Sequence, residues 1–184
     1  MASELAERFV EIPSDVKVEI KGRKVAITGP RGSISEDLSH MSVELDTKNG
    51  KVAIRSAGSK KRERAIMGTA AAHIANMVKG VTKGFSYRLK IVYAHFPVTV
   101  KVSEKEKRVS IENFGGEKTP RFASIVGDVS VKVSGDEVIV EGTRLDEVSR
   151  TASNIEEATR IREKDQRVFL DGIYVFQKGE ASKK

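Results

Sequence analysis

The chain has 184 residues, a formal net charge of +7 and no cysteine. This length suits one large domain or two small ones, and the basic excess favours an anionic partner such as nucleic acid or an anionic membrane face. No stretch is long and apolar enough to span a bilayer, the acidic residues 1–7 are unlike a targeting peptide, and the lack of cysteine excludes disulfides and thiolate sites.

The first half consists of short strand patterns followed by one helix pattern. Residues 16–20 and 24–28 alternate as half-buried strands do, residues 29–32 (Gly-Pro-Arg-Gly) predict a loop, and residues 33–35 read as a short extended piece. Strands at 42–46 and 51–55 are joined across Asn49-Gly50, a strong hairpin signal. A helix is predicted from about residue 60 to 79, with Ser59 as its cap and Gly80 as its stop.

The second half repeats this order. Residues 98–102 and 109–111 predict two strands, the second followed by a glycine loop, and residues 128–133 and 137–141 predict a hairpin. A helix follows from about residue 145 to 162, capped by Thr143 or Asp146. The two hairpins align without a gap, which indicates an internal duplication; the aligned apolar positions are Val43, Leu45, Val52 and Ile54 with Val129, Val131, Val138 and Val140. Residues 85–96 predict a strand that has no counterpart in the first half.

The predicted fold class is therefore α+β, with two tandem duplicated domains, each an antiparallel sheet with one main helix packed on it. The boundary is expected near residues 81–84. Residues 1–82 form the N-terminal α+β domain, and residues 83–184 form the C-terminal α+β domain with a short basic tail.

Residues 164–178 predict a strand–turn–strand unit with Asp171-Gly172 at the turn and a strand at 173–176. Cations surround it, at positions 160, 162, 164, 167 and 178. Two interpretations are open: a surface for a phosphate backbone, or a closing hairpin that packs on the core with solvated charges. Composition alone favours the second interpretation.

The sequence offers little support for catalysis. His40, His73 and His95 are far apart and no pair has metal-ligand spacing on one element. The chain has no phosphate loop of the Gly-Lys-Ser type, no dinucleotide fingerprint and no serine elbow. We therefore expect a protein that is not an enzyme and needs neither a metal nor a cofactor.

Clusters of cations give more support to nucleic-acid binding. Four cations within residues 60–64 open the first predicted helix, where the helix dipole prefers anions, so either a phosphate partner or a simply solvated first turn accounts for them. Lys118 and Arg121 lie in a glycine loop that allows the backbone to approach a nucleic acid closely.

Four segments resemble the large-subunit ribosomal protein six family, in its archaeal and eukaryotic type, which eukaryotes count as nine. They are residues 84–88 (Gly-Phe-Ser-Tyr-Arg), 92–97 (Val-Tyr-Ala-His-Phe-Pro), 113–118 (Asn-Phe-Gly-Gly-Glu-Lys) and 164–178. The resemblance covers essentially the whole chain, and its most specific part is residues 169–175.

The resemblance implies two tandem α+β domains and a structural, cytoplasmic constituent of the large ribosomal subunit. Such a protein binds large-subunit rRNA near the stalk base and the translation-factor docking region, mainly through its second domain. The implied partners are that rRNA, neighbouring ribosomal proteins and nearby translation factors, without a membrane or a small-molecule substrate. Carried onto this chain, RNA binding falls on Gly115, Gly116, Lys118, Arg121, Arg160, Arg162, Lys164, Arg167, Tyr174 and Lys178.

Overall fold

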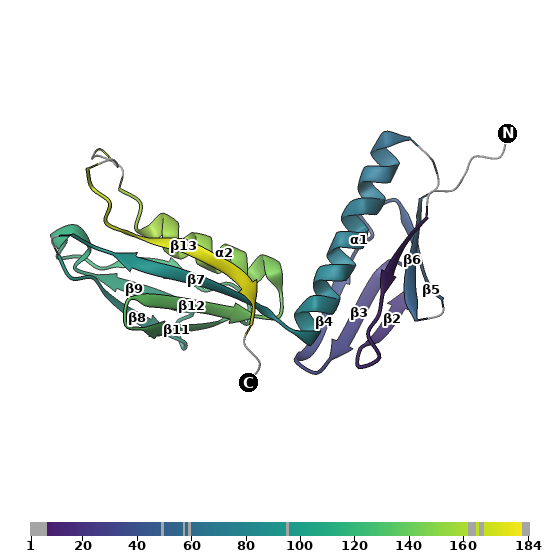
Figure 1. Ribbon diagram of the computed structural model, residues 1–184, viewed down its shortest axis with the longest axis horizontal. Coiled ribbons are helices and arrows are strands. Elements are labelled where there is room, and N and C mark those ends of the chain that lie inside the picture. Colours follow the sequence, from purple (N-terminus) through teal and green to yellow (C-terminus); the bar gives the residue numbers. More distant parts are fainter. Residues whose placement is uncertain are drawn as a thin grey trace. The chain divides into compact units, whose positions relative to one another are not determined.

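The computed structural model describes residues 7–48, 50–56, 58, 60–94, 96–161, 165 and 168–181. The chain divides into two compact units, residues 1–84 and 85–184. Each unit combines antiparallel strands with one main helix, which confirms the predicted α+β duplication (Figure 1).

The described part of unit 1 contains six strands followed by a helix. Two three-stranded antiparallel sheets, in the orders β1-β6-β5 and β2-β3-β4, make up its β structure. The elements are β1 (Glu7–Glu11), β2 (Lys17–Lys21), β3 (Lys24–Gly29), β4 (Gly32–Asp37), β5 (Val43–Lys48), β6 (Lys51–Ser56) and α1 (Lys61–Thr82).

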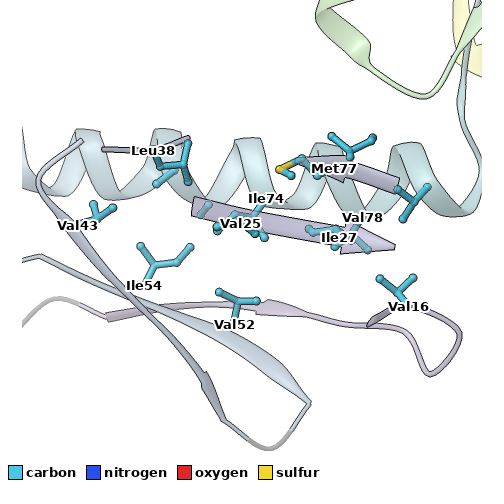
Figure 2. Close-up of a cluster of buried hydrophobic side chains, with 14 of the residues drawn as sticks. Val16, Val25, Ile27, Leu38, Val43, Val52, Ile54, Ile74, Met77 and Val78 are labelled. Carbon is cyan, nitrogen blue, oxygen red and sulfur yellow. The ribbon is translucent and has the colours of Figure 1, made fainter. Parts of the chain in front are cut away.

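The core of unit 1 lies between α1 and the strands. Alternate residues of a strand point to one face, so Val25 and Ile27 of β3 and Ile54 of β6 turn inward, where they are fully buried. Ile74 and the other apolar residues of α1 recur at helical spacing and pack into the same cluster. Figure 2 shows these side chains converging between the helix and the strands.

The limits of α1 differ from those predicted. Ser59, the predicted cap, lies outside the described residues, and the helix begins at Lys61. It does not stop at Gly80, which is buried inside the helix, but continues to Thr82. Gly84 ends it instead, because its φ of 74° turns the chain and its N–H donates to the Lys79 carbonyl oxygen at 3.1 Å.

Unit 2 has the same order of elements plus one strand at its end. Its sheets have the orders β10-β9-β8 and β11-β12-β7-β13, and all neighbouring strands are antiparallel. The elements are β7 (Phe85–Val92), β8 (Thr99–Ser103), β9 (Arg108–Glu112), a 3₁₀ turn (Phe114–Gly116), β10 (Arg121–Ser124), β11 (Ser130–Ser134), β12 (Glu137–Gly142), α2 (Leu145–Ala158) and β13 (Gly172–Glu180).

Helix α2 covers one face of the four-stranded sheet (Figure 1). Val148, Ala152 and Ile155 form its buried face, as the spacing predicted. The helix is shorter than predicted and ends at Ala158. Its cap position is Arg144, whose side chain makes no capping hydrogen bond, so neither Thr143 nor Asp146 serves as the cap.

The first strand of unit 2 does have a counterpart, contrary to the sequence prediction. Strand β1 pairs antiparallel with β6 in unit 1, as β7 pairs with β12 in unit 2. The predicted hairpin alignment holds, because Leu45 pairs with Ile54 and Val131 pairs with Val140. Strand β1 was missed because its five residues, Glu-Arg-Phe-Val-Glu, carry three charges and only a weak apolar alternation.

The predicted hairpin at the end of the chain is also wrong. Gly172 is not in a turn but begins β13, which pairs with β7 as far as Glu180. Described residues 168–171 form no strand, and residues 164, 166 and 167 of the predicted first strand lie outside the described part. The apolar residues after Gly172 find their partner in β7, some 80 residues earlier, so no local hairpin is needed.

Candidate nucleic-acid interface

The loop between β9 and β10 has a defined, glycine-dependent shape. Asn113, Gly115 and Gly116 have φ values of 58°, 59° and 80°, in the left-handed region that glycine enters without strain. The Asn113 side-chain amide donates to the Pro97 carbonyl oxygen at 3.0 Å, and Phe114 is buried. A Cβ atom at Gly116 would lie 3.2 Å from the Phe96 ring. A side chain there would therefore both crowd this ring and strain the backbone at its positive φ.

Arg121 fastens this loop to the end of α2. Its Nε and Nη2 donate to the two carboxylate oxygens of Glu117 at 2.9 and 2.6 Å, and its Nη1 donates to the carbonyl oxygens of Ala158 and Arg160 at 3.0 and 3.3 Å. The guanidinium also lies 4.5 Å from the centre of the Phe114 ring. Because four of its five N–H groups are engaged, Arg121 is built to position the loop, and Glu117 balances its charge.

The other predicted site residues of this region occupy one end of unit 2. Lys118 is exposed and forms no ion pair with the described residues. Arg160 follows α2 and lies 3.5 Å from the Glu157 carboxylate, with both side chains exposed to solvent. Gly115, Arg121 and Arg160 line one shared cavity, and Tyr174 lines a neighbouring cavity together with Arg160.

Two of the predicted residues lie on β13. The ring of Tyr174 folds back onto Gly172, and its hydroxyl donates to the Asp171 carbonyl oxygen at 3.4 Å. Lys178 pairs in register with Tyr87, and its Nζ lies 5.5 Å from the centre of that ring. Arg162, Lys164 and Arg167 lie outside the described residues.

The structure assigns a different role to Asp171, which the sequence indicated as a turn residue. Its side chain is buried, and its Oδ1 accepts the Ala94 N–H at 2.6 Å, 77 residues away in the sequence. This contact joins the segment before β13 to the segment after β7. An aspartate before a glycine looks like a turn, and no local pattern reveals so distant a partner.

Sequence reasoning also missed the contacts that hold β13. The buried Thr159 hydroxyl donates to the Glu156 carbonyl oxygen and accepts the Ile173 N–H, both at 3.0 Å. The Glu156 carboxylate accepts the Val175 N–H at 3.3 Å. Side chains at the end of α2 therefore accept the β13 N–H groups that point away from β7. These hydrogen bonds hold the start of β13 against the helix.

Within the described part of the chain, no group of three or more His, Asp or Glu side chains is placed to hold a metal ion. His73 instead has its Nδ1 2.8 Å from the Glu36 carboxylate. None of the described helices is both long and apolar enough to cross a membrane.

Comparison with known proteins finds similarity in both units of the chain. The family model described as ribosomal protein L6 matches residues 12–84 and 96–172, one segment in each unit. The large ribosomal subunit protein uL6 of Desulfurococcus amylolyticus is 49% identical over 173 residues, which is 94% of each chain. The protein of the same name from Methanothrix thermoacetophila is 47% identical over 178 residues, which is 97% of this chain and 99% of the relative.

Proposed function

The chain belongs to the ribosomal protein L6 family, and on that premise we propose that it is a structural constituent of the large ribosomal subunit. The observation that carries this proposal is the similarity to archaeal uL6 proteins, which extends over both units and nearly the full length of each chain. The role is structural rather than catalytic, and the protein works in the cytoplasm as part of the large subunit.

We further propose that unit 2 binds large-subunit rRNA through the end formed by the β9–β10 loop, the end of α2 and the start of β13. Proteins contact folded RNA largely through phosphate and sugar, so exposed cations and accessible backbone N–H groups are the features required. Gly115, beside which a Cβ atom would meet nothing within 4 Å, lets the backbone approach, and Gly116 and Arg121 hold the loop in its shape. Lys118 and Arg160 supply charge.

Tyr174 lines the cavity beside the end of α2, and Lys178 lies farther along β13, on the opposite face of the sheet; both are exposed. The family resemblance also supports RNA binding by Arg162, Lys164 and Arg167, which lie outside the described residues. This surface lies near the stalk base and the translation-factor docking region, and exposed apolar residues such as Val168, Leu170 and Phe176 are available to neighbouring ribosomal proteins.

Reconstitution with archaeal ribosomal subunits tests this proposal. Large subunits are washed in high salt to remove their own copy, the chain is added back, and sedimentation is combined with hydroxyl-radical footprinting of the rRNA. We expect rebinding to large subunits, protection of nucleotides at the stalk base and factor-docking region, and loss of binding as salt rises, because phosphate contacts release counterions.

Small subunits under the same conditions are the control. Equal binding to small subunits contradicts the assignment to the large subunit. Binding that persists at high salt and after ribonuclease treatment contradicts the RNA interface and favours a protein-interaction role for the exposed apolar residues of unit 2.

A further inference from the structure

Strand β1 leaves one edge of its sheet open, whereas its counterpart β7 has a strand on both sides. Among the described strands, β1 pairs with β6 alone, while β7 pairs with β12 and β13. The match between β1 and β7 extends to single hydrogen bonds. The Ile12 N–H donates to the Gly50 carbonyl oxygen at 3.1 Å, and at the corresponding place the Ile91 N–H donates to the Asp136 carbonyl oxygen at 2.8 Å. Within the described residues, unit 1 therefore has no strand at the position that β13 occupies in unit 2.

The same hydrogen bond fixes which backbone groups of β1 face the open edge. In an antiparallel ladder, hydrogen-bonded pairs alternate with pairs that are not hydrogen-bonded. Ile12 bonds to β6, so Val10 does too, and the N–H and C=O groups of Phe9 and Glu11 point away from β6. By register, Phe9 corresponds to Arg88 of β7, whose backbone groups face β13. No described residue forms a hydrogen bond with the outward backbone groups of Phe9.

The helices of the two units explain why unit 2 holds its own strand here. Their buried positions recur with the same spacing, as Met67, Ala70, Ala71 and Ile74 in α1 and as Val148, Thr151, Ala152 and Ile155 in α2. In unit 2, Glu156 and Thr159 accept N–H groups of β13. Their counterparts in α1 are Ala75 and Val78, whose side chains accept no hydrogen bond. A strand added to unit 1 therefore depends on β1 for its backbone hydrogen bonds.

The side chains of β1 restrict what can pair with this edge. If two copies of the chain paired antiparallel about Phe9, Glu7 of one copy would face Glu11 of the other, and like charges directly opposite are destabilising. RNA lacks the alternating N–H and C=O groups that match a strand edge. The Phe9 ring is 56% exposed and suits an aromatic or β-branched neighbour. Arg8 is exposed, forms no ion pair with another described residue, and suits an acidic neighbour.

We propose that the open edge of β1 binds an extended segment of a neighbouring protein in the large subunit, which adds a strand to unit 1 as β13 does to unit 2. In strand addition, main-chain hydrogen bonds provide affinity and alternate side chains provide specificity. The segment has an aromatic or β-branched residue opposite Phe9 and an acidic residue beside Arg8. It has no acidic residue opposite Glu7 or Glu11, so the charged edge selects against other strands. This inference rests on the proposed ribosomal function and assigns a partner to unit 1.

Site-specific cross-linking in reassembled large subunits tests this inference. The chain has no cysteine, so a benzophenone maleimide attached to F9C reports from a single position. D46C is the matched control, because Phe9 and Asp46 flank Ala53 of β6 on the same face of the sheet, but Asp46 lies on the opposite edge strand, β5. We expect F9C to cross-link to one ribosomal protein, within a segment of the stated pattern, and D46C not to cross-link to that segment.

Hydrogen exchange distinguishes strand addition from simple proximity. On assembly, the amides of Phe9 and Glu11 should exchange at least about 10-fold more slowly, because each gains a backbone acceptor. F9P removes an outward N–H without removing a bond to β6, and proline is tolerated on such an edge. F9P should abolish the added protection of Glu11, whereas F9L should keep it, and both should bind an rRNA fragment as the parent chain does. If F9P also loosens β6, the comparison of F9C with D46C still decides.

The failures of the two proposals are distinguishable. If the chain enters large subunits but F9C gives the same cross-links as D46C, or cross-links to rRNA or to a second copy, the strand inference is overturned and the ribosomal role stands. If F9C cross-links to a protein but the amides of Phe9 and Glu11 gain no protection, side chains alone make the contact, which also overturns the inference. If the chain does not enter large subunits, both proposals are overturned.

Discussion

Strands β1 and β7 hold matching places in the two units but meet different surroundings. Strand β1 has five residues, lies at the edge of its sheet beside β6, and exposes Glu7, Arg8 and Glu11. Strand β7 has eight residues, lies between β12 and β13, and buries Phe85, Leu89 and Ile91. A charged edge discourages pairing with another chain, and the partner strand β13 makes such protection unnecessary for β7.

The connection between β3 and β4 in unit 1 also differs from the matching connection between β9 and β10 in unit 2. In unit 1, β3 and β4 are joined tightly, the Arg31 N–H donates to the Val81 carbonyl oxygen at 3.0 Å, and a Cβ atom at Gly29 would lie only 2.8 Å from Val81. In unit 2, residues 113–120 form a longer loop that leaves a cavity over the end of α2. One copy of the fold is closed at this place and the other is open, so we place the function in the open copy.

Matched core truncations test whether each unit has its own core. Ile155 of α2 and Ile74 of α1 are both fully buried. We expect I155A to destabilise unit 2, and I74A unit 1, by about 2–5 kcal/mol each, because each leaves a cavity in a packed core. Calorimetry measures the loss, and amide hydrogen exchange in β6 and β12 shows which unit has lost protection. Equal loss in both units from either variant contradicts separate cores.

Two threonines at the helix ends form a second matched pair. Thr82 and Thr159 both donate to carbonyl oxygens of the preceding turn, but only Thr159 also accepts a strand N–H, that of Ile173. T159V leaves that buried donor unsatisfied and is expected to cost about 1–3 kcal/mol, whereas T82V costs less because no strand depends on Thr82. Urea unfolding measures both. If the two variants lose the same stability, the hydrogen bond from the Ile173 N–H to the Thr159 hydroxyl contributes nothing to it.

Exposed cations of the two units provide the third comparison. We expect K118Q to weaken binding to a large-subunit rRNA fragment several-fold and to lower the slope of log K against log salt by about one, as the loss of one phosphate contact does. R62Q, in the first turn of α1, should leave both quantities nearly unchanged if that turn is merely solvated. Filter binding at several salt concentrations measures the affinity and the slope for both variants. A larger effect of R62Q than of K118Q would show that the RNA interface lies in unit 1.

The smallest expected effect concerns acid stability in unit 1. The Ser39 hydroxyl and its backbone N–H both donate to Asp37, and they hold the pKa of that carboxyl below its ordinary value of 3.8, with Lys24 adding a minor contribution. The unfolded chain therefore binds the proton more readily, so the stabilisation exists above pH 3.8 and is lost as the pH falls through the lower folded value.

The variant S39A removes the largest of these causes. The pKa of Asp37 should rise toward 3.8 in a carboxyl-carbon NMR titration, and the acid loss of stability should become shallower. The pKa of Glu11, which is lowered by a hydrogen bond and the charge of Lys51, serves as the internal control and should not change. Identical titrations of Asp37 with and without the Ser39 hydroxyl would disprove this assignment.

The sequence predicted what depends on local pattern. Alternating apolar residues predicted the two hairpins and their gap-free alignment with each other, and helical spacing predicted the buried face of α2. Features that depend on distant partners were not predictable. Strand β13 forms because β7 is available to it, Asp171 is buried because Ala94 lies beside it, and the cavity joins Phe114 to Phe169 across 55 residues. Local propensity carries no information about such encounters.

The pairing of β13 with β7 has a consequence for how the chain is made. Phe85, at the start of β7, faces Glu180, at the end of β13, so unit 2 cannot complete its sheet until residue 180 has been synthesised. The pairings of unit 1, by contrast, all lie within residues 7–56, and its helix ends at Thr82. The first copy is thus able to fold before the second copy has been synthesised, whereas the copy that we propose binds RNA closes its sheet only after residue 180 has been added.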